Sequence, residues 1–281
     1  MAFVDLHTHT TASDGTVEPA KLVALAKDQG LAAVAITDHD TVEGCAEAVK
    51  AGKRLGIDVV PGIEFGTRYE GVGMTHILGY FVNTEDKNLS NELKFIVYDR
   101  DNRNFAVIKK MQEDGIDVDY HEMKERFGNV IGRPHIAQIL VEQGICEDTA
   151  DAFARYVGKG MKYWLPRETL AIDKCISLIT GAGGIAVLAH PFEYNFTKVG
   201  LEELLNYCID KGVTGIECRH SSHTAEQAVF LEYLADARGL LKTGGSDFHG
   251  DVKSDTKLGT GKGNVQVPAE WYYELKKAKG L

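Results

Sequence analysis

The chain has 281 residues, a formal net charge of −10, 44% hydrophobic residues and 26% charged residues. These values are typical of a globular protein with a sizeable core, and the acidic balance argues against a surface for long double-stranded nucleic acid. The sequence contains no run near the ~18 apolar residues of a membrane span, and its first apolar segment lacks the basic start of a signal peptide. We therefore expect a cytoplasmic protein without a membrane partner.

Short apolar segments alternate with amphipathic segments through most of the chain. The apolar runs are expected to be buried strands, and they lie in VDLHTHT, LAAVAITDHD, DVVPGIEF, THILGYFV, GGIAVLAHP, GVTGIEC and LLKTGGSDFH. Helices are expected over residues 18–29, 42–55, 200–211 and 223–238. Strand–helix alternation with short connections predicts an α/β fold in which a parallel sheet is closed, or nearly closed, into a barrel.

The alternation is interrupted between about residues 88 and 165 by a polar segment with helical patterns. Helices are expected over residues 89–113, 134–144 and 147–157. We expect an inserted helical subdomain, residues 88–165, that caps a barrel domain made of residues 1–87 and 166–281. A surface excursion that does not contact the functional site is the alternative.

Histidines and carboxylates are concentrated at the ends of the expected strands. Such side chains that follow apolar runs are His7, His9, Asp38, His39, Glu64, His190, Glu217, Asp247 and His249, and His76 lies within its strand. The carboxyl ends of parallel barrel strands open on one face, so these groups should converge there. A cluster of carboxylates and imidazoles is costly without cations, and nitrogen and oxygen ligands without cysteine suit Zn, Mn or Fe(II). The pattern predicts a metal site.

The arrangement resembles the PHP (polymerase and histidinol phosphatase) family of metal-dependent phosphoesterases over residues 1–85 and 165–255. Its motifs are DLHTHTTASDGT (5–16), TDHD (37–40), GIE (62–64), His76, LAHP (188–191) and SDFH (246–249). The resemblance implies a distorted seven-stranded, TIM-like β/α barrel with two to three divalent metal ions. It implies one metal on His7, His9, Glu64 and Asp247, a second on Asp14, His39 and His249, and a third on Glu64, His76 and His190.

The helical insertion with GRPH (132–135) and the later Ser222-His223 resemble one branch of this family. Members of that branch act on small phosphate esters, including nucleotides, nucleoside bisphosphates and RNA ends. The resemblance implies hydrolysis of nucleoside 3′,5′-bisphosphates, cyclic nucleotides or nucleoside monophosphates by a metal-bridging hydroxide. A histidinol-phosphate-like phosphomonoesterase, a 5′-3′ exonuclease on short RNA ends and an amidohydrolase-type amide or lactone hydrolase are the alternative enzymes. A metal-bound regulatory module is the non-enzymatic alternative.

Groups outside the metal shell must stabilise the remaining transition-state charge. The expected catalytic residues are Asp247, His223, which could protonate the leaving oxygen, and Arg133, which could grip a phosphate with both guanidinium nitrogens. The expected substrate-binding residues are Arg133, His135, Lys159, Lys162, Ser222 and His223. A structural role at the start of a helix is the alternative for both Arg133 and His223.

Other polar and aromatic residues near the motifs are expected to support the site or the core. We expect Asp38 or Asp40 to hydrogen-bond an imidazole and Glu217 to support the site or pack beneath it. His220 fits the family pattern less well than His223. Tyr163 and Trp164 could stack on a base or belong to the core.

Overall fold

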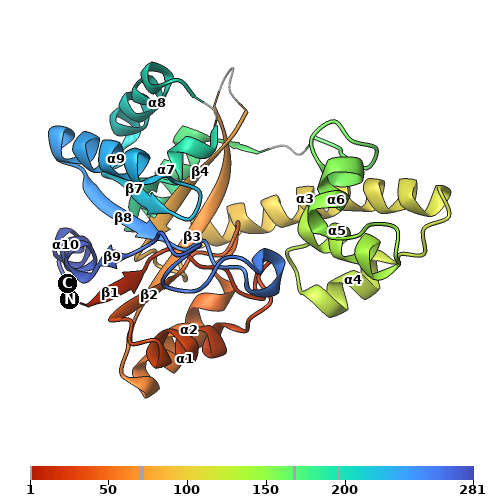
Figure 1. The fold of residues 1–281 in the computed structure, drawn as a ribbon, viewed down its shortest axis with the longest axis horizontal. Coiled ribbons are helices and arrows are strands. Elements are labelled where there is room, and N and C mark those ends of the chain that lie inside the picture. The colour runs from red at the N-terminus through yellow and green to blue at the C-terminus, as the bar shows by residue number, and fades with distance from the viewer. Residues whose placement is uncertain (1, 70–72, 167–168, 195) are drawn as a thin grey trace.

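The computed structural model describes residues 2–69, 73–166, 169–194 and 196–281, and a curved sheet lies at its centre (Figure 1). The strands are β1 (Phe3–Asp5), β2 (Ala33–Ile36), β3 (Asp58–Tyr69), β4 (Gly73–Tyr80), β5 (Leu170–Ala171), β6 (Ile185–Leu188), β7 (Gly215–His220), β8 (Leu241–Gly245) and β9 (Val267–Pro268). They pair in the order β8-β7-β6-β4-β3-β2-β1-β9, with β5 beside β3. The backbone nitrogen of Leu6 donates to Gly244 O at 3.1 Å and that of Asp247 to His7 O at 2.9 Å. These bonds join the two ends of the sheet, and the predicted distorted barrel is confirmed.

Strand β4 is antiparallel to both of its neighbours, β3 and β6, whereas β1, β2 and β3 are mutually parallel, as are β6, β7 and β8. The prediction of a wholly parallel barrel is therefore wrong at β4. Three residues separate β3 from β4, and a parallel crossover needs a dozen or more. As a consequence, β4 starts at the barrel mouth instead of ending there. This direction places His76, in the first half of β4, at the mouth.

Helices surround the barrel (Figure 1). They are α1 (Pro19–Asp28), α2 (Glu43–Leu55), α7 (Ile172–Gly181), α8 (Lys198–Lys211), α9 (Ala225–Arg238) and α10 (Ala269–Lys279). The expectations for α1, α2, α8 and α9 agree within two residues, whereas α7 and α10 were not predicted. Two single-turn segments, η2 (Pro191–Tyr194) and η3 (Gly250–Lys253), follow β6 and β8. In the part of the chain that the structure covers, no helix combines the length and the apolar character needed to cross a bilayer.

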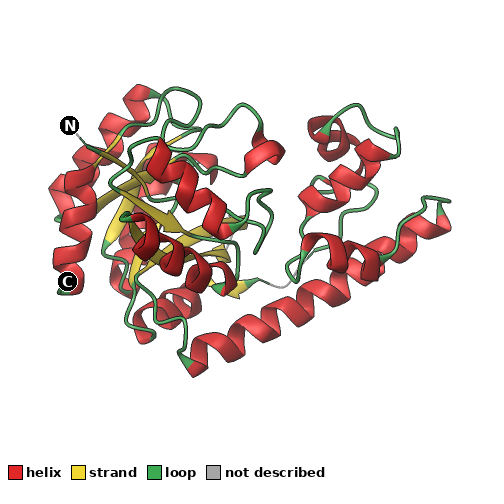
Figure 2. Ribbon diagram, turned by 90° about the horizontal axis from the view of Figure 1, so that it is seen from below, coloured by secondary structure: helices red, strands yellow, loops and turns green. Residues whose placement is uncertain are grey.

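The inserted segment contains α3 (Lys87–Glu113), α4 (Tyr120–Phe127), α5 (Arg133–Glu142), α6 (Thr149–Ala152) and the π-helical turn η1 (Phe153–Val157). Helices α4 to α6 project to one side of the barrel along α3 (Figures 1 and 2). Helix α4 was not predicted; it starts where the Asp119 carboxylate accepts from the backbone nitrogens of His121 and Glu122 at 2.8 and 3.0 Å. Such a cap stabilises a short helix that has a weak apolar pattern.

Helix α3 belongs to two hydrophobic cores. Its first half contributes Leu89, Leu93 and Ile96 to the core of the barrel. Its second half contributes Val107 and Met111, among others, to a separate core formed by the inserted helices. The division of the chain at residues 87/88 and 165/166 stays a prediction, and the packing of α3 places part of residues 88–165 within the barrel core.

Gly245 marks the closest approach of β8 to β1. A Cβ at this position would meet His7 N at 2.3 Å and His7 Cβ at 2.4 Å, and backbone atoms cannot rotate away as a flexible side chain can. We expect Gly245→Ala to lower the free energy of unfolding by about 1–3 kcal/mol. Gly181→Ala is the control, because a Cβ at Gly181 meets no atom within 4 Å. Urea denaturation of the two variants measures this, and equal stabilities would contradict the prediction.

Candidate metal centre and cavity

The carboxylate of Glu64 lies at the centre of the barrel mouth, almost completely buried. Its Oε2 is 3.3 Å from His7 Nε2, 3.3 Å from His9 Nε2 and 3.0 Å from His39 Nδ1. Its Oε1 is 2.8 Å from both His76 Nδ1 and His190 Nε2. Burial would raise the pKa of Glu64, but His39, His76 and His7 beside it hold that pKa well below its usual range. The carboxylate is therefore the anionic centre of this cluster.

A second group of ligand-type side chains surrounds Asp14. The side-chain nitrogen or oxygen atoms of His9, Asp14, His39 and His249 lie within 4.8 Å of one another. Asp14 Oδ1 is 3.3 Å from His249 Nε2, and Asp14 Oδ2 is 3.9 Å from His39 Nε2. This group contains the three ligands expected for the second metal, together with His9.

Asp247 connects the two groups from the segment after β8. Its Oδ1 is 3.2 Å from His9 Nε2, 3.7 Å from His7 Nε2 and 3.4 Å from His249 Nδ1. Its backbone has a φ of +54°, a left-handed conformation that is uncommon outside glycine and that occurs preferentially at functional sites. The carboxylate also pairs with the ammonium group of Lys253.

The chemistry of these side chains fits divalent metal ions. Within the described residues, buried side-chain atoms without a hydrogen-bond partner include His7 Nε2, both ring nitrogens of His9, Glu64 Oε2 and His220 Nε2. Buried polar atoms in native proteins normally have partners, so a cluster of partnerless imidazole nitrogens and a carboxylate oxygen fits a site that binds cations. Imidazole nitrogens and carboxylate oxygens together suit borderline divalent cations.

The Glu217 carboxylate behind the mouth holds two of the ligand-bearing segments in place. Glu217 Oε1 is 2.9 Å from His7 Nδ1, and Glu217 Oε2 accepts from the backbone nitrogen of His190 at 2.7 Å. Burial would raise the pKa of Glu217, but the His7 imidazole lowers it to about 2. The Glu217–His7 bond fixes the ring so that Nε2 faces Glu64. Glu217 thus supports the site, one of the two roles expected for it.

Asp38 and Asp40 hold backbone and loop groups instead. Asp38 accepts from Thr10 N at 2.7 Å and from Ser13 Oγ at 2.6 Å. Asp40 accepts from Gly66 N at 3.1 Å and from the guanidinium of Arg100. Asp38 thus holds the loop after β1 and Asp40 links β3 to α3, whereas the Glu217 carboxylate contacts an imidazole.

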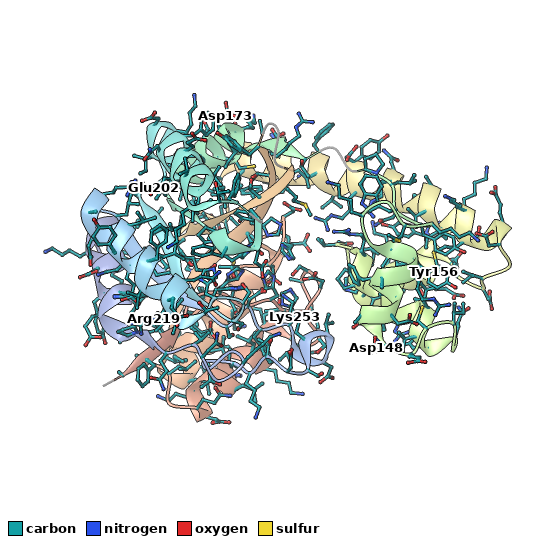
Figure 3. All side chains as sticks on the ribbon, turned by 45° about the horizontal axis from the view of Figure 1, so that its top comes forward. Asp148, Tyr156, Asp173, Glu202, Arg219 and Lys253 are labelled. Atoms are coloured by element: carbon teal, nitrogen blue, oxygen red, sulfur yellow. The ribbon has the colours of Figure 1, made fainter. Side chains whose placement is uncertain are left out.

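A cavity of about 500 Å³ lies between the ligand cluster and the inserted helices. Asp14, His39, His76 and His249 line it on the barrel side. Its cationic lining residues are Arg68, Arg100, Arg103, Arg133, Lys159 and Lys253, and its aromatic ones are Phe153 and Trp164. Figure 3 shows Lys253 at the edge of the barrel that faces the insert, where Tyr156 and Asp148 are labelled. Residues of the inserted segment thus line this cavity, and the description of the insert as a cap stays a prediction.

Only part of the expected substrate-binding set lines this cavity. Among the described lining residues are Arg133 and Lys159, but not His135, Lys162, Ser222 or His223. Lys162 Nζ is 3.0 Å from Asp114 Oδ2 in an exposed ion pair. The buried His135 ring accepts from Gly132 N at 2.9 Å at the start of α5. Lys162 and His135 therefore stabilise the insert in this structure.

The end of β7 places His220 closer to the ligands than His223, which lies in the following segment. His223 Nδ1 bonds Cys218 O at 3.0 Å, and burial lowers the pKa of His223 to about 4. His220 Nε2 is 3.4 Å from Asp247 Oδ2, and its Nδ1 is 2.7 Å from Ser222 Oγ. His220, His7 and Asp247 form a further potential metal-binding group. His220 ends β7, so its position at a strand end was the signal in the sequence.

The cavity is also lined by Lys253, Arg68, Arg100 and Arg103, which no motif in the sequence indicates. Arg100 and Arg103 are three residues apart on α3 and so lie on one helical face. The aromatic pair has separate roles: Trp164 lines the cavity, whereas Tyr163 is buried with its hydroxyl 2.8 Å from Asp114 Oδ2.

Comparison with known proteins supports the family resemblance. The PHP domain family matches residues 5–163. A 5′-3′ exoribonuclease of Haemophilus influenzae is 35% identical over 245 residues, 87% of this chain and 89% of the relative. A 3′,5′-nucleoside bisphosphate phosphatase of Chromobacterium violaceum is 31% identical over 261 residues, 92% of this chain and 91% of the relative. The crystal structure of a Bifidobacterium adolescentis protein, provisionally described as a metal-dependent phosphoesterase, superposes with a TM-score of 0.88 at 31% identity, covering 100% of this chain and 97% of that one. The chain belongs to the PHP domain family.

Proposed function

We propose that this chain is a divalent-metal-dependent phosphoesterase that hydrolyses small nucleotides. The observation that carries the proposal is the Glu64-centred ligand cluster, which opens into a cavity with cationic and aromatic walls. Clustered imidazoles and carboxylates can hold metal ions, and clustered arginines bind phosphate oxygens. The relatives named for nucleoside bisphosphate phosphatase and exoribonuclease activities support the same substrate class.

The proposal includes two or three ions of Mn, Zn or Fe. The residues that would hold them are His7, His9, Asp14, His39, Glu64, His76, His190, Asp247 and His249, with His220 as an additional candidate. When bound, such ions neutralise phosphate oxygens and supply a hydroxide from water near neutral pH. In the hydrolysis, the water oxygen bonds to phosphorus, the ester P–O bond breaks and the leaving oxygen takes up a proton.

The walls of the cavity supply the contacts that a nucleotide needs. Arg133 and Lys159 are placed to bind phosphate oxygens from the insert side, opposite the ligand cluster. Arg68 and Arg103 line the same cavity and could bind a second phosphate. The half-buried Trp164 offers an aromatic surface for a base. A nucleotide with two phosphate groups would use all of these features.

Two alternatives can be ordered by what the structure contains. A short RNA end is the second candidate, because the Haemophilus influenzae relative is an exoribonuclease and an RNA end carries the same phosphate and base. An amidohydrolase-type reaction is less favoured. Its typical modified lysine lies at a strand end, whereas Lys253 lies in η3 and pairs with Asp247.

Replacing Asp247, which connects the two ligand groups, tests the metal centre. Asp247→Asn should lower kcat by about 100-fold or more and reduce the bound metal, because an amide ligates cations less well than a carboxylate. Metal analysis of protein expressed with excess Mn should find at least two equivalents in the wild type. Asp236→Asn is the control, because Asp236 pairs with Lys242 at the exposed surface. Fewer than two equivalents in the wild type, or a fully active Asp247→Asn, would refute the proposed centre.

Removing the arginine at the start of α5 tests phosphate binding by the insert. Arg133→Ala should raise KM by about 10- to 100-fold, because a charge-assisted hydrogen bond contributes about 1.5–3 kcal/mol. Steady-state kinetics on a nucleoside 3′,5′-bisphosphate measures the change. Arg155→Ala is the control, because Arg155 forms an exposed pair with Asp151 on the same insert. An unchanged kcat/KM in Arg133→Ala would assign this arginine to structure.

A substrate panel separates the remaining classes. It contains AMP, a 2′,3′-cyclic nucleotide, a nucleoside 3′,5′-bisphosphate, histidinol phosphate, a short 5′-phosphorylated RNA and an acyl amide. We expect the highest kcat/KM with the bisphosphate, because it can use both the metal centre and the second cationic group. A preference for RNA would favour the exonuclease, and a preference for the amide would refute the phosphoesterase.

A further inference from the structure

We propose that the buried ion pair between Asp40 and Arg100 is a positioning device that sets the distance between the metal ligands of the barrel and the phosphate-binding Arg133 of the insert. This inference rests on the proposed function. It concerns two residues that are not among the expected metal ligands, and it makes Arg100 a positioning residue and not a direct contact of the substrate.

On the barrel side, Asp40 fastens the segment that carries His39. Its backbone nitrogen donates to Glu64 O at 3.0 Å, and its Oδ1 accepts from Gly66 N at 3.1 Å. Its own φ of +53° is left-handed, a conformation that needs surrounding bonds to hold it. Asp40 therefore ties the turn after His39 to the part of β3 that presents Glu64.

On the insert side, Arg100 lies in the middle of α3, between the two hydrophobic cores that this helix joins. Arg100 is 7% exposed and Asp40 1%, and the guanidinium donates to the Asp40 carboxylate. One helical turn later, the fully buried Asn104 donates to Ile131 O at 2.9 Å. Ile131 and Gly132 directly precede Arg133, the first residue of α5.

A single helical face thus contacts the two halves of the site. Residues four apart on a helix face the same way, so Arg100 and Asn104 join the His39 turn and the start of α5 through one rigid element. Replacing a buried ion pair with apolar side chains is often neutral or stabilising, so stability alone does not require this pair. Its specific value is geometric, because a planar guanidinium and a carboxylate fix both distance and orientation.

Metal binding provides a readout that does not depend on turnover. We would titrate metal-free wild type, Asp40→Asn, Arg100→Lys, Arg100→Met and the double variant Asp40→Asn/Arg100→Met with Mn²⁺ by calorimetry. Loss of a group that orients a ligand typically lowers metal affinity by about 10- to 100-fold. We expect about a tenfold loss in Asp40→Asn and Arg100→Met and a smaller loss in Arg100→Lys. The double variant should lose no more than the worse single one, because both changes break the same contact.

Kinetics on the same variants separates positioning from direct substrate binding. Positioning predicts that kcat falls and KM rises in both Asp40→Asn and Arg100→Met, because a displaced Arg133 binds phosphate less well, whereas a substrate contact by Arg100 predicts a higher KM in Arg100→Met alone. Arg126→Met and Glu142→Gln are the matched controls, because these residues form an exposed bidentate pair between α4 and α5. Both controls should keep the Mn²⁺ affinity and kcat of the wild type.

Wild-type Mn²⁺ affinity in the folded Arg100→Lys and Arg100→Met variants would overturn the proposal, as would a change limited to a higher KM in Arg100→Met. Circular dichroism checks folding, and if Asp40→Asn does not fold, the two Arg100 variants decide the outcome. A wild type that binds Mn²⁺ but hydrolyses no phosphate ester would refute the proposed function and leave the comparison of metal affinities intact.

Discussion

One buried carboxylate, that of Glu64, sets the arrangement of the barrel mouth. Burying a carboxylate is costly unless opposite charge or hydrogen-bond donors surround it, and the imidazoles of His7, His9, His39, His76 and His190 do so here. These rings come from the segments after β1, β2 and β6 and from within β4, so they meet only when the sheet is curved and closed. The close approach of Gly245 to His7 is part of that requirement. The ligand cluster therefore forms only when the barrel closes, and a change in barrel closure alters the positions of the ligands directly.

Much of the barrel side could be predicted, because its ligands follow buried strands and because the motifs resemble those of a known family. The direction of β4 could not be predicted from its apolar alternation, since a strand has the same pattern in either direction. The hydrogen bonds made by the carboxylates behind the ligands also could not be predicted from the apolar runs that precede these carboxylates. Glu217 and Asp38 both follow apolar runs, yet Glu217 reaches His7 whereas Asp38 reaches Thr10 and Ser13. This choice depends on the twist of neighbouring strands, which spacing along the chain does not record.

The insert was harder to interpret, because a polar helical segment does not indicate which of its faces meets the barrel. Lys159 and Lys162 are three residues apart, but only the former is among the described lining residues of the cavity, and the latter pairs with Asp114. Arg100 and Arg103 face the cavity from α3, whereas the large apolar side chains of Phe95 and Tyr98 on the same helix are exposed. Hydrophobicity along this helix therefore does not indicate which side meets the barrel. The cavity therefore has two walls whose residues are positioned by different parts of the fold. Strand ends determine the metal side, and the packing of α3 determines the cationic side.

The sharing of α3 between two cores has a consequence for how this chain can vary. An α-helix rises 1.5 Å and turns about 100° for each residue, so a single insertion between Ile96 and Val107 would rotate the whole insert relative to the barrel mouth. The number of residues between Ile96 and Val107 therefore fixes both the distance and the rotation of the insert relative to the barrel mouth. Length changes should instead accumulate in the connections between the inserted helices, around residues 114–119 and 143–148. Substrate preference in such a protein can diverge through the side chains of the insert while the reach of α3 stays constant.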